Sequence, residues 1–255
     1  MKTILNNLVL VGIFGLGLIS LDSCTKEQSD SQISGFGSIL DVTAAGASSV
    51  LAENLEAVIS ETVVTGDEEL DVLLHMKEEE KLARDVYSAL NLKWNNLVFT
   101  NISRAENTHM NAIIFLLQNY GTDYITVLDP GKFTNPEFEI LYNELVSKGS
   151  VSIEEAWKVG ALIEEMDIAD LEESISKTAD ENTIIVFENL QKGSRNHLRA
   201  FISQLTALNG TYTPTYLTAS EYNLIISTPT EKGNQYRMNG KANRNGRFGK
   251  RNCNL

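Results

Sequence analysis

Cysteine, proline and histidine are scarce in this sequence of 255 residues, which contains two, four and three of them, respectively. Two cysteines cannot cross-link a disulfide-dense secreted scaffold, and without a CxxC pair the chain lacks an iron–sulfur or rubredoxin-like centre. With so few prolines and 42% hydrophobic residues, the chain is neither wholly disordered nor fibrous. The sequence also lacks a glycine-rich phosphate-binding loop and a Ser-His-Asp arrangement.

Basic residues are also in the minority, since 21 lysines and arginines oppose 34 acidic residues, for a formal net charge of −13. This balance disfavours nucleic-acid binding, so we expect no nucleic-acid partner, and it permits the binding of metal ions. Residues 231–255 differ from this acidic composition, because they contain seven basic residues and one acidic residue among many glycines and asparagines. Such a segment cannot bury enough apolar surface to fold, and we predict a basic, disordered tail.

An apolar run of 14 residues, 8–21, lies near the amino terminus. It is shorter than the about 20 residues of a membrane-spanning helix, but it is typical of a signal peptide. The run ends in Leu21-Asp22-Ser23-Cys24, which resembles the bacterial lipobox, where signal peptidase cleaves before a lipid-modified cysteine. We therefore expect a signal peptide over residues 1–23 and a lipidated Cys24 that anchors the protein to a membrane of the cell envelope. The alternative is an ordinary secretory signal followed by an incidental cysteine.

Residues 24–49 are rich in serine, glycine, glutamine and aspartate, which is typical of a flexible tether. The alternative is that part of this stretch packs on the folded domain through Phe36, Ile39 or Leu40. We place the folded domain at residues 50–230, between the tether and the tail.

Apolar residues between Gly66 and Gly210 recur every three or four positions, as on one face of an α-helix. The pattern predicts four long helices, over residues 68–90, 97–119, 152–177 and 180–208. Short connections should make two antiparallel hairpins, while residues 120–151 cross between them and include a short helix from Asn135-Pro136 to Val146. Residues 212–226 should add a coil and one short helix. We therefore predict an all-α, ferritin-like four-helix bundle of two hairpins with one long crossover.

Each predicted long helix carries a charged or imidazole side chain on its apolar face, where an unpaired charge is costly to bury. Glu106 and His109 are spaced as Glu-x-x-His, which places both side chains on one helix face, one turn apart. Carboxylates and imidazoles without thiolates suit iron or manganese. The candidate ligands are Glu80, Glu106, His109, Glu164, Asp167 and His197. The alternatives are hydrogen-bonded core histidines and solvated helix faces for the acidic runs that contain Glu78, Glu79, Glu164 and Glu165. Within these runs we expect Glu79 and Glu165 on the faces next to the ligands.

The same residues carry a resemblance to known proteins. Residues 80–87 (EKLARDVY) are similar to the Glu-x-x-Ala-Arg-x-x-Tyr segment of rubrerythrins, and residues 106–109 to their first Glu-x-x-His. Four stretches within residues 70–226 more closely resemble DUF2202, a bacterial and archaeal family of unknown function in the ferritin-like superfamily: EEEKLARDVY, ISRAENTHMNAI, VGALIEEMDIADLEE and NLQKGSRNHLRAF. The resemblance implies a ferritin-like bundle with a carboxylate–histidine metal centre, beside which Tyr87 would donate a hydrogen bond.

The fourth helix departs from a symmetric di-iron pattern, which would have a second Glu-x-x-His there. This chain has Ser194 in place of that glutamate, three residues before His197. Asp167, one turn from Glu164, is the candidate replacement, and it would keep four carboxylates and two histidines. Otherwise the site would hold one metal ion, or a second one only weakly. Iron, in a di-iron or mononuclear centre, or manganese is the expected cofactor.

Two classes of function are consistent with these features. In the first, the protein is a membrane-anchored, metal-dependent redox protein. In the second, it is a non-catalytic lipoprotein that binds a partner and keeps a structural or vestigial metal site. The sequence leaves both the reaction and the formation of an oligomer open.

Overall fold

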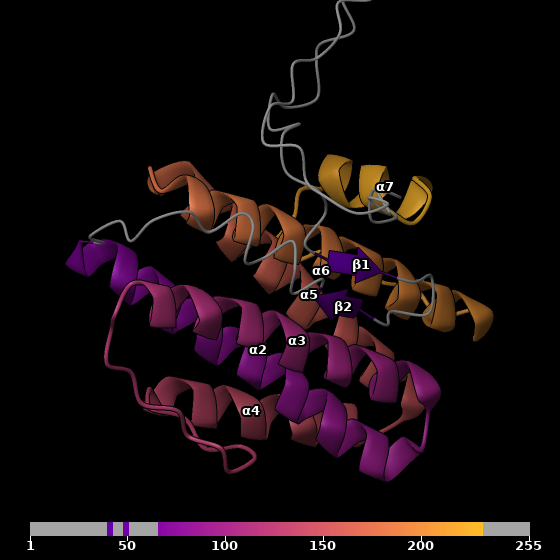
Figure 1. Ribbon diagram of the computed structural model, residues 1–255. Coiled ribbons are helices and arrows are strands. Elements are labelled where there is room, and N and C mark those ends of the chain that lie inside the picture. Colours follow the sequence, from indigo (N-terminus) through magenta and orange to yellow (C-terminus); the bar gives the residue numbers. More distant parts are fainter. Residues whose placement is uncertain (1–39, 43–47, 51–65, 232–255) are drawn as a thin grey trace, which may run out of the picture. The chain divides into compact units, whose positions relative to one another are not determined.

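The computed structural model describes residues 40–42, 48–50 and 66–231 (Figure 1). The predicted signal peptide, Cys24, most of the predicted tether and the tail beyond residue 231 lie outside the described residues. The described part contains six helices and two short strands, so the predicted all-helical bundle is confirmed. Among the described helices, none is both long and apolar enough to cross a membrane.

The first hairpin consists of α2 (Asp67–Trp94) and α3 (Leu97–Asn119), which lie side by side (Figure 1). Asn95 ends α2 in the left-handed conformation, with a φ of 47°. Asn96 then caps α3, because its side chain accepts a hydrogen bond from the backbone N–H of Val98. Asparagine suits both positions, since it tolerates the left-handed region and carries a side-chain acceptor. Helix α2 therefore continues beyond the end predicted at residue 90.

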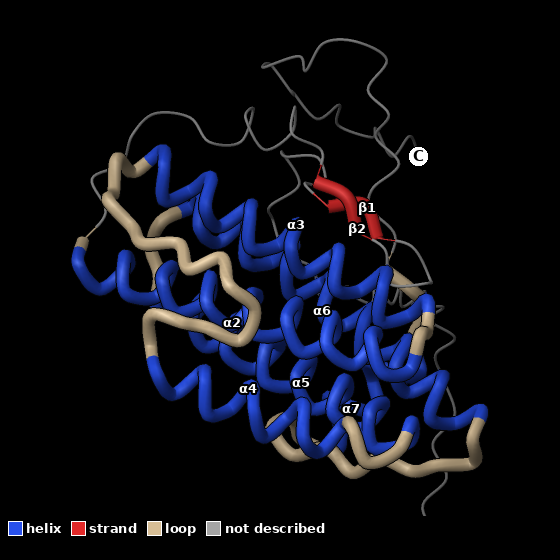
Figure 2. The backbone as a smooth tube through the Cα atoms, turned by 90° about the horizontal axis from the view of Figure 1, so that it is seen from below, coloured by secondary structure: helices blue, strands red, loops and turns tan. Residues whose placement is uncertain are grey.

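The crossover contains α4 (Pro136–Gly149), which begins as predicted and ends three residues later than residue 146. Asn135 caps this helix, and proline occupies the first turn, where no backbone donor is needed. The crossover is held to α2 by Glu78, whose two carboxylate oxygens accept the backbone N–H groups of Thr134 at 2.6 Å and Asn135 at 2.9 Å. As a result α4 lies against α2 and α5 (Figure 2).

The second hairpin consists of α5 (Ile153–Lys177) and α6 (Glu181–Ala207). Ser152 and Asp180 cap these helices, each accepting a backbone N–H three residues further along, at 3.1 and 2.8 Å. The short helix α7 (Ala219–Ser227) follows and packs on α6. The caps lie where the sequence predicts them, so the bounds of both long helices agree with the prediction within one or two residues.

Two short strands precede the bundle, β1 (Leu40–Val42) and β2 (Ser48–Val50). They pair in antiparallel fashion, with Leu40 opposite Val50. The pair lies within the stretch and at the boundary where the sequence predicts a tether. Since the intervening and flanking residues are outside the described part, the tether itself stays a prediction.

The core has two apolar clusters separated by a polar layer. One cluster gathers aromatic rings at one end of the bundle, where Phe99 stacks on Trp157 at 4.5 Å between ring centroids. The other fills the opposite end around Met76 and Phe187. Between them, at mid-length of α2, α3, α5 and α6, the buried side chains are mainly charged or imidazole groups. The candidate site therefore lies in the middle of the bundle.

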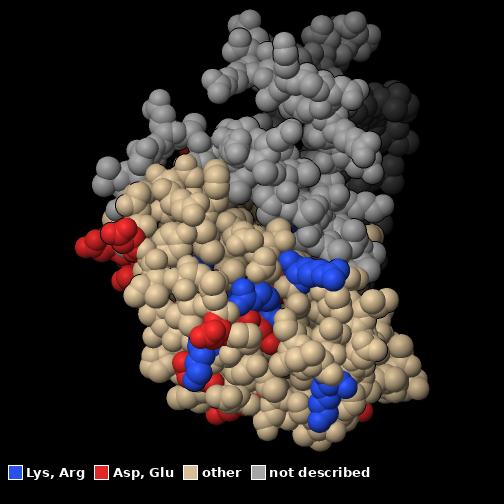
Figure 3. Space-filling model, turned by 60° about the horizontal axis from the view of Figure 1, so that its bottom comes forward, with Lys and Arg blue, Asp and Glu red and all other residues tan. Residues whose placement is uncertain are grey.

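The surface is less acidic than the net charge suggests. On the face that Figure 3 shows, acidic and basic side chains lie next to one another over the lower part, and a separate group of acidic side chains lies at the left edge. Exposed pairs of this kind include Lys132 with Glu139 at 3.0 Å, and each stabilises the fold by about 1 kcal/mol or less. By contrast, eight acidic side chains are buried among the described residues, against two lysines and two histidines. The interior of the bundle thus holds more acidic than basic groups.

Candidate metal centre

The first part of the site joins α2 to α3. Glu106 and His109 project from one face of α3, and Glu80 approaches from α2. The Nδ1 atom of His109 lies 2.8 Å from Oε2 of Glu106 and 3.3 Å from Oε2 of Glu80. All three side chains are buried, with exposed fractions of 0–1%. Three ligand atoms from two helices therefore face one another in a space closed to water.

The second part joins the two hairpins through the same glutamate. The other oxygen of Glu106, Oε1, lies 2.9 Å from Nδ1 of His197 on α6, and Oε2 of Glu164 on α5 lies 3.4 Å from that nitrogen. The rings of His109 and His197 are nearly parallel, with centroids 5.4 Å apart. Glu106 thus directs one oxygen to each histidine and belongs to both groups of three possible ligands.

Several polar atoms of this cluster are buried without hydrogen-bond partners. Neither ring nitrogen of His109 or His197 has a partner, although Glu106 oxygens approach both rings within hydrogen-bonding distance. One oxygen each of Glu80, Glu106 and Asp167 is also unpaired. Each such group costs about 1–3 kcal/mol if it stays unsatisfied. Nitrogens and oxygens that converge without forming hydrogen bonds fit a coordinated cation, so these residues suit a metal ion.

Burial and mutual charge shift the pKa values of the cluster strongly. Burial raises the pKa of Glu80 to about 8 and that of Glu164 to about 7. Burial opposes ionisation of Glu106 as well, but the charges of His197 and His109 outweigh it and lower the pKa of that carboxyl. Burial likewise opposes protonation of His197, yet Glu106 and Glu164 raise its pKa to about 10. The cluster therefore retains positive charge as protons wherever no cation provides it.

Two residues predicted beside the site support its ligands. The hydroxyl of Tyr87 donates to Oε1 of Glu164 at 2.6 Å, which fixes the orientation of that carboxylate. Ser194 donates to Asp167, whose second oxygen is unpaired. Asp167 belongs to neither group of three ligands, although its charge interacts with those of Glu80 and Glu164. The structure thus brings five of the six predicted ligands together and places Asp167, held by Ser194, beside them.

Three features of the site escape the sequence analysis. The alternative in which Glu79 and Glu165 lie on solvated faces is wrong, because both are buried. Glu165 accepts hydrogen bonds from the Tyr212 hydroxyl at 2.7 Å and the Thr215 backbone at 2.9 Å, so it anchors the segment before α7. Gly193 is also essential to the geometry, since a Cβ there would lie 2.6 Å from Cε1 of His109. No spacing rule reveals these contacts, because each depends on a neighbouring helix or segment.

Comparisons with known proteins match the part of the chain that forms the bundle. A family profile described as "Uncharacterized protein domain (DUF2202)" matches residues 69–229. The uncharacterized protein MJ0754 of Methanocaldococcus jannaschii is 51% identical over 168 residues, which are 66% of this chain and 91% of that protein. The crystal structure of hypothetical protein MJ0754 resembles this one with a TM-score of 0.65 and 48% identity, covering 68% of this chain and 99% of that one. These names state no activity.

Proposed function

The chain belongs to the DUF2202 family, and we propose that this member binds two iron or manganese ions in a dinuclear centre inside a ferritin-like bundle. One ion would be held by Glu80, Glu106 and His109, and the other by Glu106, Glu164 and His197. The observation that carries the proposal is the set of fully buried histidine nitrogens and carboxylate oxygens that converge without hydrogen bonds.

The choice of metal follows from the ligands. Two imidazoles and three carboxylates, with no thiolate, suit iron or manganese better than copper. The di-iron bundles of the ferritin-like proteins use a glutamate from each of two helices and Glu-x-x-His from each of the other two. This chain keeps that arrangement through Glu80, Glu164 and the pair Glu106 and His109, and it keeps His197 of the second pair.

The protein's own residues would shape the chemistry of such a centre. Iron or manganese would supply one-electron redox chemistry there. Tyr87 would hold Glu164 in place through its 2.6 Å hydrogen bond, and Gly193 would leave room for the His109 ring. The apolar clusters at both ends exclude water from the layer between them. We further propose that lipidation of Cys24 anchors this domain in the cell envelope, a proposal supported by the sequence alone.

Metal content is the direct test. The purified full chain, stripped with a chelator, would be loaded anaerobically with Fe²⁺ or Mn²⁺, desalted and measured by elemental analysis. We expect two equivalents for the wild type and a loss of both sites in Glu106→Gln, because that side chain serves both. Glu165→Gln is the matched control: Glu165 is equally buried, but it belongs to none of the groups of possible ligands, and its Oε2 accepts hydrogen bonds from Tyr212 and Thr215, so the variant should keep both ions.

Two results would contradict the proposal. A wild type that takes up less than one equivalent of either metal would leave the non-catalytic binding module as the better function. A Glu106→Gln protein with wild-type metal content would show that the ions bind elsewhere.

A further inference from the structure

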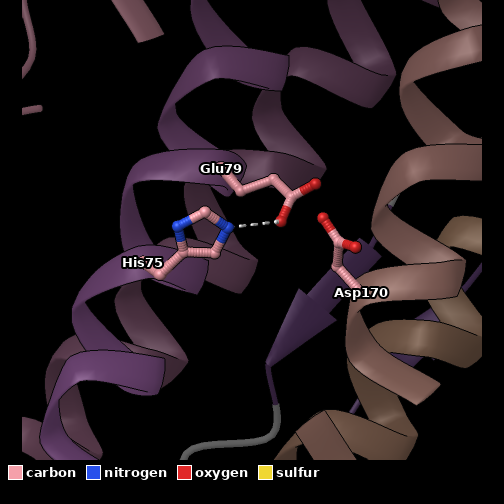
Figure 4. Close-up of side chains that lie close together, drawn as sticks. All are labelled: His75, Glu79 and Asp170. Carbon is pink, nitrogen blue, oxygen red and sulfur yellow. Dashed lines mark ion pairs between the residues drawn. The ribbon is translucent and has the colours of Figure 1, made fainter. Parts of the chain in front are cut away.

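A third group of side chains suited to a cation lies outside the buried centre, where α2 meets α5 (Figure 4). His75 and Glu79 are one turn apart on α2, and Asp170 faces them from α5. One ligand atom of each lies within 4.8 Å of those of the other two. In Figure 4 the carboxylates of Glu79 and Asp170 point toward each other, and the His75 ring is directed at Glu79.

Glu79 is the residue that makes this group unusual. Its side chain is only 3% exposed, and neither carboxylate oxygen has a hydrogen-bond partner. Nε2 of His75 lies 3.9 Å from Oε2 of Glu79, which is too long for a hydrogen bond. The negative charges of Asp167 and Asp170 also act on it. A buried carboxylate that faces a second carboxylate is stabilised by a cation between them or by a shared proton, and an imidazole directed into the same space favours the cation.

The other two members keep the group open to solvent. The side chain of His75 is 52% exposed, and Asp170 is partly exposed. The His75 ring packs against Phe138 of α4 in a tilted arrangement, with centroids 5.3 Å apart, and this contact favours the ring orientation that Figure 4 shows. The group therefore combines a buried, unsatisfied oxygen with an accessible, oriented nitrogen.

We propose that His75, Glu79 and Asp170 form a second metal site, which takes a divalent first-row cation from solvent and supplies it to the buried centre. One imidazole nitrogen and two carboxylate oxygens suit Mn²⁺, Fe²⁺ or Zn²⁺. Cation binding at this site stands on its own geometry, whereas the supply role rests on the proposed function of the centre.

The position of the site explains why a supply role is needed. The ligands of the buried centre are 0–1% exposed, so a cation reaches them only through the protein. Glu79 directly precedes the ligand Glu80, and Asp170 lies one turn after Asp167, whose Oδ1 is unpaired. The charges of Asp167 and Asp170 both act on Glu79, and those of Glu80 and Glu164 act on Asp167, so acidic side chains lie close to one another from the partly exposed Asp170 to the buried centre.

The test uses the metal-stripped full chain and Mn²⁺, counted by the loss of the electron paramagnetic resonance signal of the free ion. His75→Phe keeps a ring against Phe138 but removes both nitrogens, and Asp170→Asn keeps the size of its side chain. We expect three bound ions for the wild type. Each variant should bind the third ion at least about tenfold more weakly and fill the buried centre more slowly. Glu144→Gln, an exposed position on α4, is the control and should behave as the wild type.

A variant without the two buried histidines separates this site from the centre. In His109→Ala/His197→Ala the centre should be lost, one ion should remain, and adding His75→Phe should remove it. If His75→Phe and Asp170→Asn bind as many ions as the wild type and at the same rate, the second site is refuted while the proposed function stands. If the wild type binds one ion that His75→Phe removes, the proposed function and the supply role fail and the surface site stands. An unchanged filling rate with one ion lost would refute the supply role alone.

Discussion

Gly193→Ala should displace His109, a ligand of the proposed metal centre, by steric contact alone. A Cβ at this position of α6 would lie 2.6 Å from Cε1 and 2.7 Å from Nε2 of His109. The ring would have to move by about 0.8 Å to reach ordinary van der Waals contact. Since His109 is fully buried, that movement strains the packing around it. We expect a loss of about 1–3 kcal/mol in the free energy of unfolding.

The same displacement should weaken metal binding, because Nδ1 of His109 would no longer lie at its present distances from Glu80 and Glu106. A change in ligand orientation of this kind typically lowers affinity by about 10- to 100-fold. Thermal denaturation should show a decrease in Tm of about 2–12 °C for a domain of this size. Mn²⁺ titration of the same protein should then show the loss of affinity.

Gly149→Ala provides the matched control, because a Cβ there would lie 2.8 Å from a methyl carbon of Leu90 in the apolar cluster. It should lower Tm by a similar amount and leave the metal ligands in place. If both variants lose stability and metal affinity equally, the weakened binding reflects general loosening of the bundle. If Gly193→Ala binds Mn²⁺ as the wild type does, His109 is not a ligand in the way the geometry indicates.

Four further predictions concern the support of the site and the ends of the chain. Tyr87→Phe should cost about 1–3 kcal/mol in urea unfolding, because it leaves the buried Oε1 of Glu164 without its donor; a wild-type midpoint would contradict this. Glu78→Ala should make residues 120–135 more sensitive to limited proteolysis, because two backbone N–H groups of the crossover lose their acceptor; an unchanged cleavage rate would show that other contacts suffice. Truncation after Glu231 should leave Tm unchanged, whereas Glu231→Ala should lower stability by about 1 kcal/mol through loss of its ion pairs with Arg195 and Arg199; equal effects would show that the tail packs on the domain. Cys24→Ser should move the protein from the detergent phase to the aqueous phase in a partition assay, and a wild type found in the aqueous phase would refute lipidation.

The sequence predicts the long helices well because their ends have local causes. Ser152 and Asp180 are caps whose side chains satisfy the first turn, and apolar residues repeat on one face of each helix. The convergence of the ligands is predictable for the same reason, since residues at mid-length of four antiparallel helices must meet in one layer. Glu106 and His109 are the clearest case, because their spacing alone places them on one face.

The burial of α2 is not predictable from its own pattern. Residues 77–81 read Lys-Glu-Glu-Glu-Lys, which is typical of a solvated face, yet all five side chains are buried. The cause is the crossover, whose carbonyl oxygens at Ile125 and Asp129 accept hydrogen bonds from Lys77 and Lys81. The two carbonyl groups lie 48 residues beyond the lysines that they contact, so a distant segment covers a second face of α2. The period of the apolar residues shows which face of a helix is apolar. It does not show which polar residues form hydrogen bonds with a distant loop.

The asymmetry of the two halves of the site has a structural consequence for the role of Asp167. In a symmetric centre a glutamate at position 194 would reach the second ion, but Ser194 donates instead to Asp167. That hydrogen bond holds one oxygen of Asp167 and leaves Oδ1 unpaired next to the charges of Glu80 and Glu164. Asp167 is therefore oriented beside the proposed centre, and Asp170 follows it one turn later along α5. On the proposed assignment, the serine takes the place of a fixed ligand and orients a carboxylate whose Oδ1 is unpaired, which would favour passage of a cation over permanent coordination at that position.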